Sequence, residues 1–303
     1  MTKTAVWKII YVEEIVSKVV PAVEKIRFTK MHGIGNDYVY IDCMDGVEPD
    51  GGALAVAMSP RRFSVGSDGV IMICRSSVAD AKMRMFNADG SEGKMCGNGI
   101  RCVGKFLYDK GYVKKETVTV ETLSGVKTLA LNVRNGKVAS ASVDMGRAVT
   151  DPRLVPAKFD GDAAIDAPLF VLGREYRVTA VSMGNPHAVI FGEDVDALDL
   201  EKIGPEFENH PAFPDRVNTE FAEFLTPGAI RMRVWERGSG ETFACGTGAC
   251  ATAVAAVLTG RARPGEKLAL RLRGGDLSIT VGDDLGVIME GPAVTVYDGE
   301  FYL

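Results

Sequence analysis

Hydrophobic and polar residues alternate along five stretches of the chain, a pattern typical of β-strands with one buried and one solvent-facing side. These stretches are residues 82–86, 117–121, 137–143, 230–235 and 267–272. A helix is expected directly after each of two cysteines, Cys96 and Cys245, and should end near Gly111 or Gly260, because glycine is a common C-terminal cap. The second helix is rich in alanine and valine and should be buried on all sides. The pattern therefore predicts a layer of strands around a central helix.

The chain also repeats itself at a constant offset of 149 residues. At this offset the segments 35–41, 83–86 and 96–99 coincide with 184–190, 232–235 and 245–248, and Gly111 coincides with Gly260. Two stretches of about 120 residues are therefore interpreted as copies of one fold, each long enough to be a domain. The predicted fold class is α+β, with two pseudo-symmetric domains from an internal duplication, each a mainly antiparallel β-sheet or barrel wrapped around a central helix.

The repeat also predicts the domain boundaries. We expect a first domain over residues 26–146 and a second over 147–291, with the final strand, 292–303, returning to the first domain. Residues 1–25 form a separate N-terminal extension. Its apolar residues recur at close to helical spacing, at Ile9, Val12, Val16, Val19 and Val23. An amphipathic helix ended or kinked by Pro21, packed on the body or on a neighbouring subunit, is expected, with an early start of the sequence or a frayed tail as alternatives.

Composition and charge narrow the class of partner. The chain has 303 residues, 46% of them hydrophobic, and a net charge of -5 from 40 acidic and 35 basic residues, without a basic block. This balance argues against a nucleic-acid or anionic-membrane surface and favours a small-molecule partner. No apolar run approaches the roughly 20 residues of a membrane span, so a cytoplasmic location is expected. The six cysteines are too sparse for a disulfide scaffold and should be free thiols.

Cys96 and Cys245 are the candidate catalytic residues. A thiol at the start of a helix faces unpaired backbone N–H groups, which should favour the thiolate and let the cysteine act as a base. The following small residues would let a substrate carboxylate approach the same N–H groups. Two copies packed about a pseudo-two-fold axis would present one thiol to each face of a shared cleft. Inverting a stereocentre needs such a pair, one group as base and the other as acid.

Other uses of the cysteines fit the spacing less well. Cys96 and Cys102, like Cys245 and Cys250, would point to different sides of their helices, so the pairs should not converge on zinc or act as dithiols. Cys102 and Cys250, with Cys43 and Cys74, are expected to be small core residues. The glycine-rich segments lack the lysine of a phosphate-binding loop. No metal or other cofactor is therefore expected, although a pyridoxal-dependent reaction stays open at this point.

Six segments resemble the diaminopimelate epimerase family. They are residues 30–37 (KMHGIGND), 86–91 (FNADGS), 95–102 (MCGNGIRC), 184–187 (GNPH), 235–238 (WERG) and 244–248 (ACGTG), and the match runs from about residue 26 to the C-terminus. The resemblance implies a cofactor-independent epimerase that interconverts L,L- and meso-diaminopimelate, in the synthesis of lysine and peptidoglycan precursors, and a homodimer. A proline-type racemase or related isomerase on the same fold is the alternative, followed by a binding protein without chemistry.

The resemblance also implies roles at matching positions. Cys96 and Cys245 would transfer the proton, while His187 and Glu236 would lie near Cys96 and Cys245 respectively and tune their protonation. The substrate-binding residues would be Asn36, Asn87, Gly97, Asn98, Asn185, Asn218, Glu236, Arg237, Gly246 and Thr247. Gly69 departs from the family pattern, because some members have glutamine there. Asn87 coincides with Glu236 in the repeat, and Tyr38 with His187, so the site should be asymmetric, as an asymmetric substrate requires.

Overall fold

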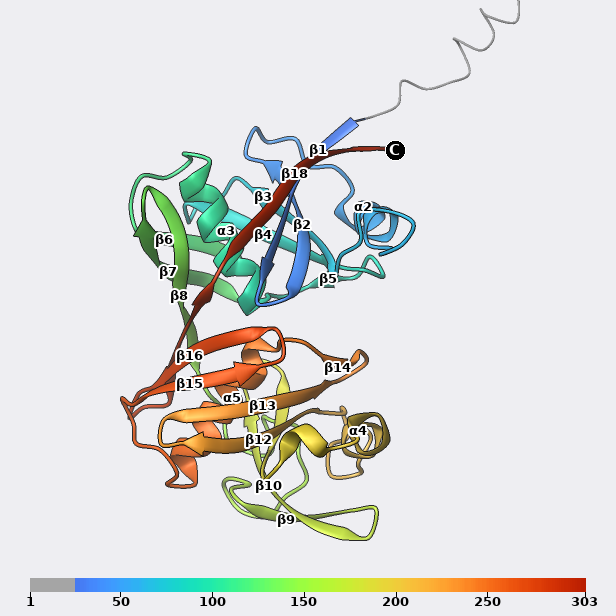
Figure 1. Ribbon diagram of the computed structural model, residues 1–303, viewed down its shortest axis with the longest axis vertical. Helices are drawn as coiled ribbons and strands as arrows, with labels where there is room; N and C mark the ends of the chain where they lie inside the picture. The colour runs from blue at the N-terminus through green and yellow to red at the C-terminus, as the bar shows by residue number, and fades with distance from the viewer. Residues whose placement is uncertain (1–24) are drawn as a thin grey trace, which may run out of the picture.

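The computed structural model describes residues 25–303, which form two domains stacked along the long axis of the molecule (Figure 1). The helix predicted within residues 1–25 falls on residues 1–24, outside the described part. The N-terminal domain contains β1 (Lys25–Gly33), β2 (Asn36–Cys43), α2 (Gly51–Met58), β3 (Gly69–Cys74), β4 (Ala81–Asn87), β5 (Glu92–Gly93), α3 (Gly97–Asp109), β6 (Thr117–Thr122), β7 (Gly125–Arg134) and β8 (Lys137–Arg147).

The C-terminal domain repeats this order. It contains β9 (Ala167–Val171), β10 (Arg174–Ser182), β11 (Pro186–Phe191), η1 (Val195–Ala197), α4 (Leu200–Glu208), β12 (Asn218–Thr226), β13 (Ala229–Glu236), β14 (Gly240–Thr242), α5 (Gly246–Leu258), β15 (Lys267–Leu272), β16 (Gly275–Val281) and β17 (Gly286–Pro292), followed by β18 (Val294–Tyr302). All five predicted strands are present, and β15 alternates buried with less buried residues as its sequence pattern indicates.

The duplication predicted from the sequence is confirmed by matching elements. The helices α3 and α5 each have 13 residues and start 149 residues apart, and β1 and β10 are related by the same offset. Strand pairing also repeats: β2 and β3 are parallel, as are β11 and β12, and the parallel pair β4 and β6 corresponds to β13 and β15. The remaining pairings are antiparallel, so each domain is a mainly antiparallel sheet.

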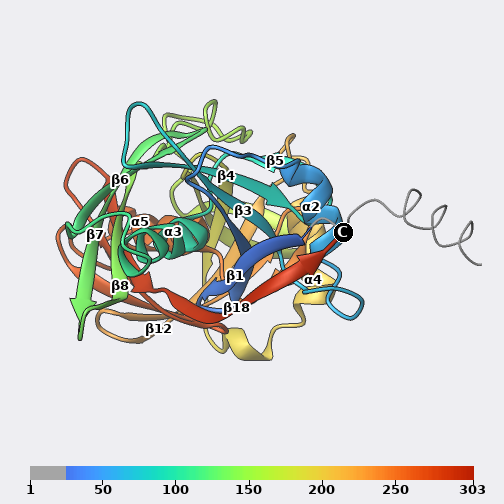
Figure 2. The same ribbon diagram turned by 90° about the horizontal axis from the view of Figure 1, so that it is seen from above.

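Each sheet curls around its helix. In the N-terminal domain α3 packs against β1, β2, β6, β7 and β8, and in the C-terminal domain α5 packs against β10, β11, β12, β15 and β16. Figure 2 shows α3 and α5 from above, with strands on several sides of them. Residues 97–107 of α3 are buried, and α5 is buried over nearly its whole length. The prediction of a central helix in each domain is therefore confirmed.

Both helices end in the same hydrogen-bonded cap. Gly111 has a φ of +85°, and its N–H donates to the Tyr108 carbonyl while the N–H of Tyr112 donates to that of Leu107. Gly260, with a φ of +71°, repeats this arrangement at the end of α5. A residue with a side chain would be strained in this left-handed conformation, which explains the glycine at both predicted ends.

Two strand pairings join the domains. β8 pairs with β17 of the other domain, and β18 pairs antiparallel with β1, from Lys25 opposite Tyr302 to His32 opposite Val294. The strand equivalent to β1 in the C-terminal domain is β10, which pairs with β9. β18 therefore pairs with β1 in the same way that β9 pairs with β10. A continuous apolar cluster includes residues of both central helices. In the described part of the chain, no helix has the length and apolar character needed to cross a membrane.

Candidate active site

The thiols of Cys96 and Cys245 cap the starts of the two central helices. Cys96 Sγ accepts a hydrogen bond from the N–H of Gly99 at 3.3 Å, and Cys245 Sγ accepts one from the N–H of Gly248 at 3.4 Å. Both cysteines have extended backbone conformations, as N-cap residues usually do. The two copies of the fold therefore present their thiols in the same local setting.

The two helix starts meet between the domains. Asn98 Nδ2, at the start of α3, donates to the carbonyl of Ala244 at 3.4 Å. Met289 of β17 lies against both Gly97 and Gly246, where added Cβ atoms would come within 2.8 and 3.2 Å of its side chain. Gly97, Asn98 and Gly246 thus bring α3 and α5 together with little intervening side-chain volume.

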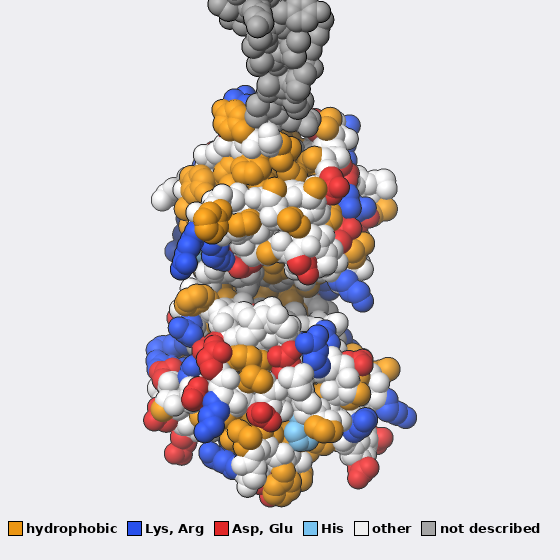
Figure 3. All heavy atoms as spheres, turned by 90° about the vertical axis from the view of Figure 1, so that its right-hand side faces the viewer, with side chains coloured by type: hydrophobic (Ala, Val, Ile, Leu, Met, Phe, Trp, Pro, Cys, Tyr) orange, Lys and Arg blue, Asp and Glu red, His pale blue; other side chains and the backbone are white. Residues whose placement is uncertain are grey.

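A cleft of about 840 Å³ lies between the domains. Four of the predicted substrate-binding residues line it: Asn36 and Asn87 from the N-terminal domain, Glu236 and Arg237 from the C-terminal domain. Figure 3 shows the narrow waist between the domains on one side of the molecule. Of the lining residues, Asn36 contacts Cys96, and Ala244 directly precedes Cys245 in the chain. A second hollow, of about 930 Å³ beside β1 and β18, contains none of the predicted residues.

Burial dominates the ionisation of both thiols. It raises the pKa of Cys96, against the lowering effect of the Gly99 and Asn98 N–H groups and of the Arg101 cation. It raises the pKa of Cys245 further, because the Glu236 and Glu220 carboxylates act in the same direction. The expectation of thiols with lowered pKa values is therefore wrong. The helix N–H groups do favour the thiolate, but loss of hydration outweighs them.

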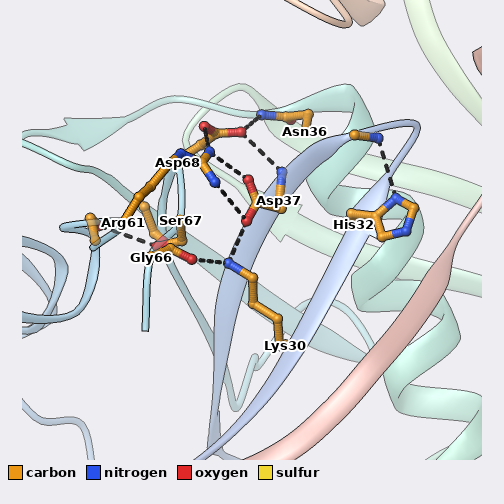
Figure 4. A network of polar contacts seen from close by, with 11 residues as sticks. Lys30, His32, Asn36, Asp37, Arg61, Gly66, Ser67 and Asp68 are labelled. Carbon is orange, nitrogen blue, oxygen red and sulfur yellow. Dashed lines mark hydrogen bonds and ion pairs between the residues drawn. The ribbon is translucent and has the colours of Figure 1, made fainter. Parts of the chain in front are cut away.

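Asn36 contacts Cys96 and belongs to a network of charged residues, which Figure 4 shows. The Cys96 thiol donates to Asn36 Oδ1 at 3.2 Å, and Asn36 Nδ2 donates to Asp68 at 2.7 Å. Arg61 bridges Asp68 and Asp37 at 2.6 and 2.7 Å. Because Asp68 accepts from the nitrogen of the Asn36 amide, the oxygen of that amide faces Cys96.

A buried lysine completes the network. Lys30 contacts both the Asp37 carboxylate and the carbonyl of Gly66. Burial of Asp37 opposes its ionisation, but Arg61 and Lys30 more than offset this effect and lower its pKa. Asp37 therefore stays ionised at neutral pH, and the network holds the turn that carries Asn36.

His187 is buried in the C-terminal domain, between Glu220 and Asn185. Its ring is fully buried, with Nδ1 2.7 Å from Glu220 Oε1 and Nε2 3.1 Å from Asn185 Oδ1. Within residues 25–303 it has no hydrogen bond to Cys96, and its proximity to that thiol stays a prediction. The residue beside Cys96 is Tyr38, whose pKa is raised first by burial and then by the Cys96 charge. Tyr38 and His187 are equivalent in the repeat, so the two copies differ in the aromatic side chain at this position.

Glu236 lies next to Cys245. Its Oε1 accepts a hydrogen bond from the Thr242 hydroxyl. Burial raises the pKa of Glu236, while hydrogen bonds from Thr242 and Cys245 act against this rise. Thr247, another predicted site residue, lies with its hydroxyl 3.5 Å from Cys245 Sγ. Cys245 thus has a carboxylate and a hydroxyl as neighbours, where Cys96 has an amide.

Asn218 and Asn87 fix the edges of the cleft. Asn218 donates from Nδ2 to the Pro186 carbonyl at 2.8 Å and accepts from the N–H of Arg237 at 2.9 Å. It therefore ties the start of β11 to the turn after β13, where Arg237 lies. Asn87 Nδ2 donates to Ser91 Oγ at 3.0 Å.

Gly69 has no space for a side chain. An added Cβ would lie 2.0 Å from the Phe86 carbonyl oxygen and 3.0 Å from Tyr38 Cε1. We expect Gly69→Ala to lower the free energy of unfolding by about 2 kcal/mol or more, as forced overpacking does, and Gly69→Gln to be at least as costly. Urea unfolding would measure both variants. Gly192→Ala is the control, because nothing lies within 4 Å of its added Cβ; equal stabilities for the two alanine variants would contradict this account.

Comparison with solved structures defines the class of protein. The chain is similar to a hydroxyproline epimerase from Agrobacterium vitis, with a TM-score of 0.68 and 17% identity over 92% of this chain and 93% of that chain. It is also similar to a PhzF-family phenazine biosynthesis protein from Bacillus anthracis, with a TM-score of 0.67 and 16% identity over 92% of this chain and all of the other. The molecule therefore has the duplicated fold of proline racemases and PhzF proteins.

Sequence comparison then identifies the family. The diaminopimelate epimerase model matches residues 28–150 and 179–296. Diaminopimelate epimerase from Desulfovibrio desulfuricans is 53% identical over 92% of this chain and 99% of its own length, and that from Acetivibrio thermocellus is 50% identical over 91% and 98%. The chain belongs to the diaminopimelate epimerase family and is an isomerase of the epimerase class.

Proposed function

We propose that the protein interconverts L,L- and meso-diaminopimelate by a two-base mechanism, with Cys96 and Cys245 as thiolate and thiol. The observation that carries this proposal is the pair of equivalent thiols, each capping a helix start, at the junction of two copies of one fold. Diaminopimelate epimerases at about half identity over nearly the whole chain support the substrate. The reaction would supply precursors of lysine and peptidoglycan.

The proposed reaction needs only groups of the protein. The thiolate on one face takes the α proton, and the thiol on the other face delivers its proton to the α carbon, so that the configuration inverts. The first N–H groups of a helix have no acceptor within it. Those of Gly97 and Asn98, with those of Gly246 and Thr247, can therefore bind the reacting carboxylate and stabilise the charge that develops on it. No pyridoxal phosphate, metal or nucleotide enters this scheme.

The surroundings of the thiols suit an asymmetric substrate. Asn36, Asn87 and Arg237 line the cleft beyond the sulfurs and would bind the distal amino-acid group. His187 and Glu236 would tune proton transfer, Glu236 directly at Cys245 and His187 through Asn185 and the rest of its buried contacts. A homodimer and a cytoplasmic location are also proposed, from the family resemblance.

Incubation with each stereoisomer in deuterated water tests the substrate. We expect deuterium at the α carbon of the inverted diaminopimelate and no reaction with proline. Chiral chromatography with mass spectrometry would measure both. Turnover of proline but not diaminopimelate would instead identify a proline-type racemase, and binding of diaminopimelate without turnover a binding protein.

A further inference from the structure

The buried charges around the two thiols differ although their backbone settings match. At the repeat offset, Ile71 coincides with Glu220, and Arg101 coincides with Cys250. Ile71 and Glu220 occupy equivalent places: a Cβ added to Gly99 would lie 2.6 Å from Ile71 Cδ1, and one added to Gly248 would lie 2.5 Å from Glu220 Oε1. One copy therefore has a buried cation and the other a buried anion near the start of its helix.

Among residues 25–303, Arg101 is a buried cation without an anionic partner. It is fully buried, and its Nη1 donates to the carbonyl of Gly97, the residue after Cys96, at 3.0 Å. Its other contacts are the Pro292 carbonyl and the Met289 sulfur, and Nη2 has no partner among residues 25–303. An arginine stays protonated at neutral pH, so this charge is compensated only by neutral dipoles. A negative charge on a neighbouring group would stabilise it.

Glu220 is the buried charged residue beside Cys245, as Arg101 is beside Cys96. It is fully buried, with Oε1 bonded to His187 Nδ1 at 2.7 Å and close to Gly248, whose N–H binds Cys245 Sγ. Its Oε2 has no partner in the described part of the chain. A carboxylate in this position disfavours a second negative charge on the adjacent sulfur.

We propose that these two buried charges polarise the thiol pair, so that Arg101 favours the thiolate at Cys96 and Glu220 favours the protonated thiol at Cys245. This inference deepens the proposed function and rests on it. Arg101 and Glu220 act through the cysteines and are positioning residues. The free enzyme would be ready for the stereoisomer whose α proton faces Cys96, while the other isomer requires the proton to move from Cys245 to Cys96 first.

Other titratable groups also face the thiols. Cys96 has Arg101 opposing the effect of burial, with Tyr38 and Glu236 also facing it. Cys245 has two carboxylates, those of Glu236 and Glu220, which add to the effect of burial. Glu236 acts on both sulfurs and so does not by itself separate them. Arg101 and Glu220 each act in the direction that places the thiolate at Cys96.

Alkylation of the substrate-free protein as a function of pH tests the proposal. Iodoacetamide labelling of each cysteine would be followed by peptide mass spectrometry. The plateau rate depends on accessibility, whereas the midpoint of the pH profile reports ionisation of the thiol. We expect the Cys96 midpoint to lie at least about one pH unit below that of Cys245, a tenfold difference in thiolate fraction at low pH. Equal midpoints, or the reverse order, would overturn the proposal.

Charge variants separate the proposal from a merely structural effect. Arg101→Met should raise the Cys96 midpoint, while Arg101→Lys should keep it near the wild-type value. Glu220→Gln should lower the Cys245 midpoint and leave that of Cys96 in place. If Arg101→Met does not fold, as judged by circular dichroism, the midpoints of Glu220→Gln and Arg101→Lys still test the proposal. Midpoints that move together, or not at all, would contradict polarisation. Because no substrate is present, this result is independent of whether diaminopimelate is turned over.

Discussion

Replacing Cys96 or Cys245 by alanine is expected to lower the rate of diaminopimelate epimerisation by about 10³-fold, the size of contribution that one positioned acid or base makes. Inversion requires a group on each face, and either variant keeps only one. In deuterated water the remaining thiol should still exchange the α proton of a single stereoisomer and return deuterium to the same face. Nuclear magnetic resonance would measure the exchange, and chiral chromatography the retained configuration.

Cys250→Ala is the matched control for Cys245→Ala. Cys250 lies on the same helix, is fully buried and does not line the cleft, so its loss should leave epimerisation within a few-fold of wild type. Full activity of either Cys96→Ala or Cys245→Ala would exclude the two-thiol mechanism. Complementary selectivity, with each variant exchanging a different stereoisomer, would assign each thiol to one face of the substrate.

The fold could be predicted from the sequence because its signals are local and occur twice. Cys96 and Cys245 lie at helix starts, Gly111 and Gly260 at helix ends, and both kinds of position depend on residues a few places apart. The constant offset of 149 residues then shows that the two sets of signals belong to two copies of one fold. The return of the final strand to the first domain was also expected, but its pairing with β1 is a long-range contact whose partner strand and register the sequence did not indicate.

The electrostatics of the site could not be predicted in the same way. The helix N–H groups at Cys96 are a local property, but burial of its sulfur depends on how two domains pack, and burial prevails. The ring of His187 is held by Glu220, which lies on the adjacent parallel strand, and this partner could not be identified from the sequence. The missed residues Arg101 and Glu220 do have a signal in the sequence, since each is a charged residue whose repeat equivalent is apolar or a thiol.

Arg237→Met is expected to lower kcat/KM for diaminopimelate by about one to two orders of magnitude, mainly through KM, because charge-assisted hydrogen bonds contribute roughly 1.5–3 kcal/mol. Arg237 lines the cleft, and Asn218 holds its backbone while the Asp215 carbonyl accepts from its Nη1 at 2.7 Å. In the proposed complex, this anchoring would hold the guanidinium at the distal carboxylate of the substrate. Steady-state kinetics in both directions would measure the effect.

Two further variants, a conservative one at Arg237 and one at a remote arginine, show whether loss of carboxylate recognition causes the fall in kcat/KM. Arg237→Lys keeps the charge but loses the two-pronged donor, so it should fall between wild type and Arg237→Met. Arg62→Met removes an equal charge from an exposed position and should leave KM unchanged. With a substrate analogue that lacks the distal carboxylate, Arg237→Met and the wild-type enzyme should bind equally weakly. If the variant weakens binding of the analogue as much as that of diaminopimelate, Arg237 supports the shape of the cleft instead, because its loss would then act on any ligand regardless of the group that it presents.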